Sequence, residues 1–177
     1  MGYSPARARV AKRPVLIGII GWKNSGKTTL VERLIPLLSE RGLKVATVKH
    51  THHELRPHDG GTDGERHARA GAVRTIVIGP NAWEASGHRQ EGVPPAFADL
   101  AHHLAGADVV LVEGYKIAPI PKIEVRRRAS PTQQPLAARG DQVIAVVSDH
   151  VTDAGGLPLF DLDDVEGIAA FIAGRVA

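Results

Sequence analysis

Short apolar runs recur along the chain, and each has the length of a β-strand. Five of them are rich in valine and isoleucine and almost free of polar residues: 15–20, 45–48, 75–78, 109–112 and 143–147. Nearly continuous apolar runs of this length are typical of strands that are buried on both faces, as in parallel sheets. The pattern therefore predicts a sheet whose core is built from β-branched residues.

Helical periodicity appears between and after these runs. Apolar positions repeat at helical spacing from residue 30 to residue 38, and Gly42 follows as a stop signal. Pro36 lies inside this helix and cannot donate to the carbonyl of Glu32, so we expect it to bend the axis. A last helix is predicted from about Asp163, with one apolar face formed by Val165, Ile168, Ala169 and Ile172.

Two further helices are predicted in the middle of the chain. Thr62 is followed three residues later by Glu65, which is the capping-box pattern, and this short helix should end near Gly71. The other helix covers 95–104. Strands that alternate with helices predict an α/β fold of the P-loop type, a mostly parallel sheet flanked by helices. The segments 82–92 and 122–128 interrupt the alternation and could add a hairpin or edge strands.

Composition and charge limit the classes of protein. The 177 residues contain no cysteine, which excludes disulfides, thiolate metal sites and cysteine nucleophiles. There is no apolar run of membrane-spanning length and no signal segment, so we expect a cytoplasmic protein that binds neither membrane nor nucleic acid. Four of the 22 lysines and arginines lie in residues 1–13, which leaves 18 against 19 acidic groups in the rest. We therefore predict a basic arm over 1–13, either disordered or bound to an acidic partner, and a single domain over 14–177.

The strongest motif is GWKNSGKT at Gly21–Thr28, which matches the phosphate-loop pattern G-x-x-x-x-G-K-[ST] in full. Its backbone N–H groups would surround an anion, Lys27 would reach the β- and γ-phosphates, and the Thr28 hydroxyl would bind Mg²⁺. The loop follows a buried strand and opens an amphipathic helix, which an ordinary glycine-rich turn need not do. The predicted nucleotide-binding residues are Gly21, Lys23, Asn24, Ser25, Gly26, Lys27, Thr28 and Thr29.

A phosphate loop also needs a carboxylate that holds Mg²⁺. Asp108 precedes the run 109–112 and Glu113 follows it. Because the carboxyl ends of parallel strands meet at one edge of the sheet, Glu113 is at the correct end and Asp108 is at the wrong one. We therefore predict that Glu113 acts at the site, and that Asp108 caps the entrance of its strand.

The segment 49–63 leaves the second strand at the same edge and concentrates acidic and histidine side chains. Asp59 and Asp63 are candidates for a second acidic group that reaches Mg²⁺ through water. The histidines allow two interpretations, a site for Zn²⁺ or Ni²⁺, or a polar loop that binds phosphates or a pterin-like ligand. These histidines are His50, His52, His53 and His58.

Two further features remain open. The stretch 122–128 ends in three arginines, Arg126–Arg128, and is either a solvated edge strand protected by charge or a patch that binds phosphate or a partner. The chain has no Asn-Lys-x-Asp motif for reading guanine. Asp149 follows the last core strand and could accept from guanine, or it could cap the next turn.

Several segments, taken in their order along the chain, resemble those of the MobB family of molybdopterin-guanine dinucleotide biosynthesis adaptor proteins. The resemblance lies in the phosphate loop GWKNSGKTTL, the histidine-rich segment KHTHHELRPHDGGTDGERHARAGA, LVEGYK and PKIEVRR, across roughly 15–128. It implies a dimeric GTP-binding protein with weak GTPase activity that assists a MobA-like molybdopterin guanylyltransferase. Lys27 and Thr28 would bind phosphates and Mg²⁺, and Glu113 with the Asp59–Asp63 region would line the same site. Gly64 departs from the Ser or Thr expected after Asp63, which weakens a ligand role there.

Two other functions compete with the adaptor. Histidines beside a phosphate loop also occur in metal-insertion GTPases of the nickel type, but those typically carry a cysteine metal motif that this chain lacks. A small-molecule kinase would need an arginine-bearing lid, for which only Arg126–Arg128 offers cations. The sequence contains no convincing glutamine to position water and no obvious arginine finger, so any GTP hydrolysis should be slow.

Overall fold

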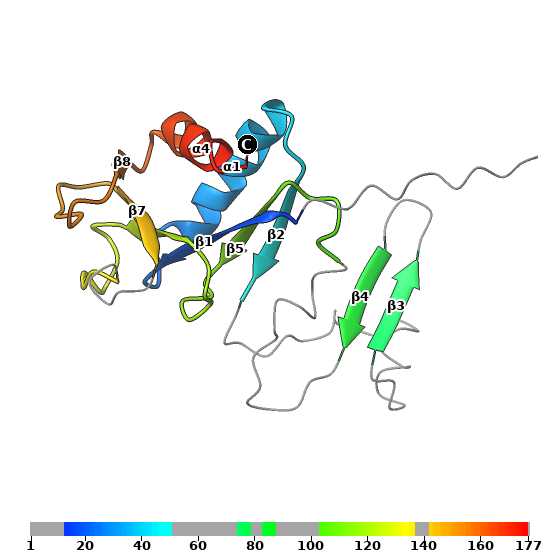
Figure 1. The fold of residues 1–177 in the computed structure, drawn as a ribbon. Helices are drawn as coiled ribbons and strands as arrows, with labels where there is room; N and C mark the ends of the chain where they lie inside the picture. Colours follow the sequence, from blue (N-terminus) through cyan, green and yellow to red (C-terminus); the bar gives the residue numbers. More distant parts are fainter. Residues whose placement is uncertain (1–12, 51–73, 79–82, 88–102, 137–141, 177) are drawn as a thin grey trace, which may run out of the picture. The chain divides into compact units, whose positions relative to one another are not determined.

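The computed structural model describes residues 13–50, 74–78, 83–87, 103–136 and 142–176 (Figure 1). The chain divides into two compact units. One comprises residues 1–51 together with 101–177, and the other comprises His52–Leu100.

The first unit contains a six-stranded sheet in the order β2-β5-β1-β6-β7-β8. Every neighbouring pair in this sheet is parallel. The predicted α/β fold with a mostly parallel sheet is therefore confirmed. Its strands are β1 Val15–Gly21, β2 Val45–Lys49, β5 Val109–Glu113, β6 Lys122–Arg126, β7 Val143–Ser148 and β8 Leu159–Asp161.

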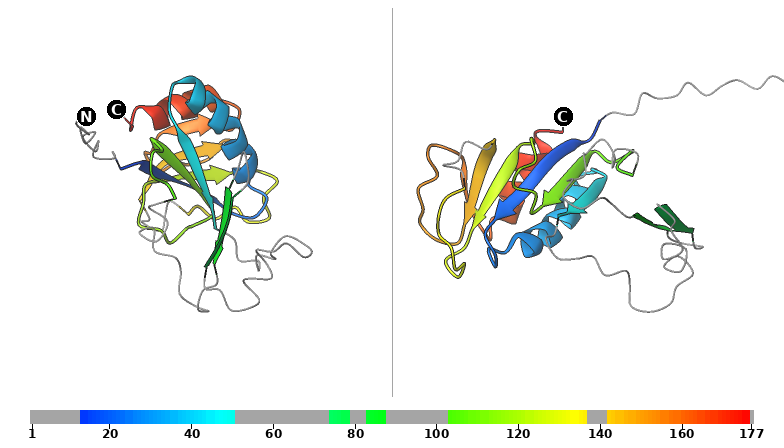
Figure 2. Two further views of the ribbon diagram at one scale, coloured as in Figure 1. Left: turned by 90° about the vertical axis from the view of Figure 1, so that its right-hand side faces the viewer. Right: turned by 90° about the horizontal axis from the view of Figure 1, so that it is seen from below.

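Two helices of this unit, α1 (Lys27–Glu40) and α4 (Val165–Ala173), cover one face of the sheet and pack against each other (Figure 2). The buried apolar side of α1 matches the predicted spacing, and the left-handed Gly42 follows its end at φ 80°. In α4 the predicted apolar face is buried, and Asp164 caps the helix by accepting from the N–H of Gly167 at 3.0 Å. The predictions of these two helices are confirmed.

The apolar run 75–78 forms a strand, but not in the parallel sheet. It is part of β3 (Arg74–Ile78), which pairs antiparallel with β4 (Trp83–Gly87) in the second unit. The hairpin predicted around 82–92 is thus confirmed, whereas placing 75–78 among the strands of the parallel core was wrong. An apolar run predicts a strand but not its partner, and the short connection between the two strands brings them together as neighbours.

The interpretation of 122–128 as a solvated edge strand was also wrong. β6 lies between β1 and β7, and all five of its residues are buried. Ile123 and Val125 join the apolar core under the helices, while the charged residues of β6 alternate with them and so point to the other face. The edge strand beyond β6 and β7 is instead the three-residue strand β8, which the sequence did not predict.

Several expectations fall outside the described residues. They are the basic arm apart from Arg13, the helix over 62–71 and most of the helix over 95–104. The single domain over 14–177 stays a prediction. Within the described part of the chain, neither helix has the length and apolar character needed to cross a bilayer.

Candidate functional site

The candidate site lies at the edge where the parallel strands end. The phosphate loop leaves β1 there, between the carboxyl ends of β5 and β6. The strand register places Ile19 beside Glu113 and Gly21 beside Val125. Residues that follow these strands are therefore delivered to the mouth of the loop.

The loop backbone needs glycine at two positions for different reasons. Gly26 adopts a left-handed conformation at φ 87° and is the N-cap of α1. At Gly21, an added Cβ would collide with the backbone carbonyl of Val125 and with the hydroxyl of Ser25. Asn24 is also left-handed, at φ 61°, which asparagine tolerates better than most residues. The first-turn N–H groups of α1 point toward the loop, and no side chain caps them, so they suit an anion.

Lys27 bends back over this loop. Its Nζ donates to the carbonyl of Trp22 at 2.6 Å and lies 3.3 Å from Ser25 Oγ. Burial lowers the pKa of Lys27; the Glu113 carboxylate raises it, while the charges of Lys116 and Lys49 lower it further. The ammonium group is thus held at the centre of the loop among other charged side chains.

Thr28 and Glu113 are brought together as the direction of the strands predicted. The Thr28 hydroxyl donates to Glu113 Oε1 at 2.6 Å, although 85 positions separate the two residues. Lys49 Nζ lies 3.7 Å from the same oxygen. Asp108 instead accepts from the backbone N–H of Lys44 at 2.8 Å, at the entrance of β5 and β2. The pair Thr28 and Glu113 offers two oxygen ligands of the kind that Mg²⁺ binds.

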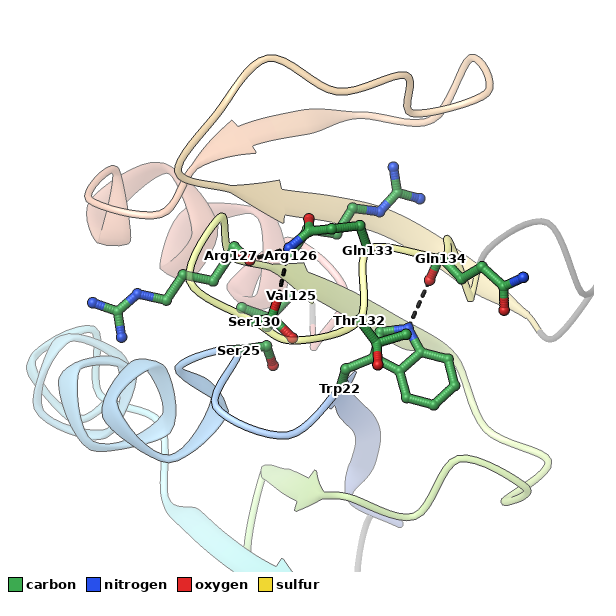
Figure 3. A pocket seen from close by; sticks show the side chains of 9 residues that line it. All are labelled: Trp22, Ser25, Val125, Arg126, Arg127, Ser130, Thr132, Gln133 and Gln134. Atoms are coloured by element: carbon green, nitrogen blue, oxygen red, sulfur yellow. Dashed lines mark hydrogen bonds between the residues drawn. The ribbon is translucent and has the colours of Figure 1, made fainter.

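The loop over 127–136 packs onto the phosphate loop, a contact that sequence reasoning missed. Trp22 Nε1 donates to the carbonyl of Gln134 at 2.6 Å, and Ser130 Oγ donates to the carbonyl of Lys23 at 3.0 Å. Gln133 Nε2 donates to three carbonyls of its own loop. Figure 3 shows these side chains around a small hollow between the two loops. Nothing in the spacing of these residues signals the contact, because it joins two irregular segments.

A buried ion pair anchors this covering loop to β6. Glu124 Oε2 accepts from Arg126 at 2.9 Å, and both side chains are almost fully buried. The other carboxylate oxygen accepts from the N–H of Leu136 at 2.7 Å, and Arg126 also donates to the carbonyl of Asp153 at 2.6 Å. Of the three arginines predicted as a patch, Arg126 is therefore an internal residue.

Asp149 connects the segments that follow β6 and β7. Its Oδ1 accepts from the backbone N–H of Arg128 at 2.7 Å and lies 2.8 Å from Nδ1 of His150. Burial on its own raises the pKa of Asp149, but the hydrogen bonds from His150 and Arg128 and the charges of His150 and Arg127 outweigh it and lower the pKa. Its bonds reach back to the loop after β6, so the expectation that it caps the following turn was wrong. Ser148 Oγ accepts from the N–H of His150 instead.

Comparison with known proteins decides the family. The family model described as "Molybdopterin guanine dinucleotide synthesis protein B", MobB, matches residues 16–149. The chain belongs to the MobB family.

Named relatives and solved structures agree with this membership. A Haemophilus influenzae protein named molybdopterin-guanine dinucleotide biosynthesis adapter protein is 34% identical over 157 residues, which cover 89% of this chain and 86% of that protein. The Escherichia coli protein of the same name is 33% identical over 159 residues, covering 89% and 90%. The crystal structure of Bacillus subtilis MobB has a TM-score of 0.69 at 27% identity and covers 92% of this chain and 98% of its own.

The histidine-rich segment of this MobB-family chain is only partly described. His50 follows β2, and its ring stacks on Tyr115 with centroids 4.6 Å apart. Asp59, Asp63, His52, His53 and His58 lie outside the described residues. Among the residues that are described, no group of three or more His, Cys, Asp or Glu is placed to hold a metal ion.

Proposed function

We propose that this MobB-family protein is a GTP-binding adaptor with weak GTPase activity that assists molybdopterin-guanine dinucleotide synthesis. The observation that carries the proposal is the hydrogen bond of 2.6 Å between Thr28 and Glu113, beside a phosphate loop whose lysine lies over it. The role in the pathway is supported by the names of the curated relatives, which are called adapter proteins of molybdopterin-guanine dinucleotide biosynthesis.

In this proposal the phosphates lie in the loop in front of α1. The loop N–H groups and the Lys27 ammonium bind the β- and γ-phosphates. Asp149, at the exit of β7, is the candidate for contact with the guanine base, and its carboxylate would have to share its bonds with Arg128 and His150. The proposed nucleotide-binding residues are Gly21, Lys23, Asn24, Ser25, Gly26, Lys27, Thr28, Thr29 and Asp149.

Mg²⁺ fits the oxygen donors at the end of β5. Thr28 Oγ1 and Glu113 Oε1 would hold it, with Asp59 or Asp63 as candidates that act through water. When bound, the ion neutralises charge on the phosphate oxygens. Lys49 Nζ lies 3.7 Å from Glu113 Oε1, and the attraction between the two charges helps to orient this carboxylate.

Hydrolysis by the isolated protein should be slow. Gln133 directs its amide to carbonyls of its own loop and is not available to position a water. Arg126 is engaged with Glu124 and with the segment around Asp153. A turnover above about 1 s⁻¹ without a partner, far from the slow unassisted scale, would contradict the proposal.

We further propose that the protein is a cytoplasmic homodimer whose partner is a MobA-like molybdopterin guanylyltransferase. The word adapter in the names of the relatives supports a partner protein. The test is reconstituted synthesis of molybdopterin-guanine dinucleotide, with the transferase alone and with added wild-type protein or Lys27→Ala. The wild-type protein should raise the yield and the variant should not. Equal yields in all three reactions would contradict the adaptor function.

Competition between nucleotides tests which base the protein prefers. A fluorescent guanine nucleotide bound to the protein should be displaced by GTP at lower concentration than by ATP. Displacement by ATP at equal or lower concentration would contradict the assignment of GTP as the ligand.

A further inference from the structure

Two lysine ammonium groups contact Trp22 in the phosphate loop. Lys27 Nζ donates to the Trp22 carbonyl at 2.6 Å, and Lys116 Nζ lies 3.9 Å from the centroid of the Trp22 ring. A cation over the face of an indole ring is held by the negative charge of that face. Lys116 comes from the loop after β5, three residues beyond Glu113.

The backbone before Lys116 is fixed by tight contacts. Gly114 is left-handed at φ 83°, and its N–H donates to the carbonyl of Ile19 on β1 at 3.1 Å. A Cβ at Gly114 would lie 2.9 Å from the carbonyl oxygen of His50. Tyr115 is buried and stacks on the His50 ring. The chain therefore turns at the end of β5 in a defined way, which delivers Lys116 to the phosphate loop.

The surroundings of Lys27 carry an excess of positive charge. Lys116 Nζ lies on the ring of Trp22, whose carbonyl Lys27 contacts, and Lys49 Nζ lies 3.7 Å from the nearby carboxylate of Glu113. Bringing like charges together is unfavourable unless an anion lies between them. A cluster of ammonium groups beside the loop N–H groups therefore suits a highly charged anion. Such a ligand carries more negative charge than Lys27 alone would neutralise.

We propose that Lys116 distinguishes a nucleoside triphosphate from a diphosphate by contacting the terminal phosphate beside Lys27. This inference rests on the proposed function. Thr28 and Glu113 would hold Mg²⁺ and so mark the end of the phosphate chain that the ion would neutralise. Lys116 reaches the loop from the strand that carries Glu113, and so from the side of the terminal phosphate. With a diphosphate bound, the ammonium stays on the Trp22 ring.

The test is calorimetric titration of Lys116→Gln with GDP and with a non-hydrolysable GTP analogue, each with Mg²⁺. A charge-assisted contact predicts that the variant loses about tenfold or more in affinity for the triphosphate and less than about twofold for GDP. Lys116→Arg, which keeps the charge, should retain the preference for the triphosphate. Lys44→Gln is the matched control, since it makes the same charge change at the opposite end of the sheet and should alter neither affinity.

The outcomes separate this inference from the proposed function. Equal losses for both nucleotides, or no loss for either, would overturn the role of Lys116. If wild-type protein binds the triphosphate, Lys27→Ala does not, and Lys116→Gln binds like wild type, only this inference fails. If wild-type protein binds neither nucleotide, the proposed function fails and the inference with it.

Discussion

Glu113 is the residue whose role depends most directly on its position at a strand end. Its carboxylate accepts from Thr28 and lies near Lys49, so it is held at the mouth of the phosphate loop. Asp108, at the other end of the same strand, bonds to the backbone of Lys44. Two acidic residues five positions apart therefore lie at opposite ends of the strand, and Glu113 contacts Thr28 whereas Asp108 contacts the Lys44 backbone.

Replacing Glu113 with Gln should remove the Mg²⁺-dependent part of GTP binding and leave binding in EDTA nearly unchanged. The amide is a weaker ligand for a hard cation than the carboxylate. Isothermal titration with and without Mg²⁺ measures the difference. Asp108→Asn serves as the control, and its Mg²⁺ dependence should equal that of the wild type. An unchanged Mg²⁺ effect in Glu113→Gln would show that this residue is not a ligand.

Asp149 predicts a pH dependence of stability. Its pKa in the folded protein is lowered from an ordinary value near 3.8, so the folded state favours the carboxylate. The stabilisation is complete above that value and is lost as the pH falls through the lowered pKa. Because the side chain is about one-third exposed, the effect should stay below about 1 kcal/mol.

The measurement is urea unfolding of wild type and Asp149→Asn at pH 6 and at pH values below 3.8. The free energy of unfolding should be higher for the wild type at pH 6, and the gap should narrow in acid. A gap that widens as the pH falls would contradict the lowered pKa.

At the scale of elements, the turn after β5 decides where Lys116 lies. Gly114→Ala should destabilise the fold by more than about 2 kcal/mol, because it adds a close contact with the His50 carbonyl to the strain of a left-handed residue. Gly42→Ala is the matched control. Gly42 has nearly the same φ, with open space around its Cβ position, and should cost only about 1 kcal/mol. Equal losses in thermal or urea unfolding would show that the contact with His50 has no energetic effect.

The ion pair between Glu124 and Arg126 on β6 should contribute measurably to the stability of the fold. Glu124→Gln would leave Arg126 buried without its carboxylate and should cost about 3 kcal/mol in urea unfolding. Glu32→Gln, an exposed position on α1, should change stability by less than about 0.5 kcal/mol. The double variant Glu124→Gln, Arg126→Met should lose less free energy of unfolding than the two single variants lose together. A loss equal to their sum would show that the two side chains are not coupled.

The same elements show what sequence reasoning can and cannot give. The direction of parallel strands was enough to predict that Glu113, and not Asp108, lies beside the phosphate loop. The spacing of α4 was enough to predict its buried face. β6 was misplaced because alternating charges usually indicate a solvated strand, whereas here Glu124 and Arg126 form an ion pair inside the fold. The bond from Ser130 to the Lys23 carbonyl joins two loops distant in sequence, and such contacts have no periodic signal.

At the scale of the whole molecule, the family match over 16–149 begins in β1 and ends just after β7. It includes the phosphate loop, Glu113, Lys116 and Asp149, and all four belong to the first unit. The second unit carries the β3–β4 hairpin. The residues proposed to bind the phosphates and the base thus belong to the first unit, whereas the candidates Asp59 and Asp63 belong to the second.

Calorimetric titration of GTP into wild-type protein and Lys27→Ala, with Mg²⁺ present, tests the central claim most directly. Lys27 lies over the loop at 2.6 Å from the Trp22 carbonyl, where the phosphates are expected to replace that contact. We expect saturable binding to the wild type and a loss of affinity of at least about tenfold in the variant. Binding of equal strength to both proteins, or no binding of GTP or ATP to the wild type, would contradict it.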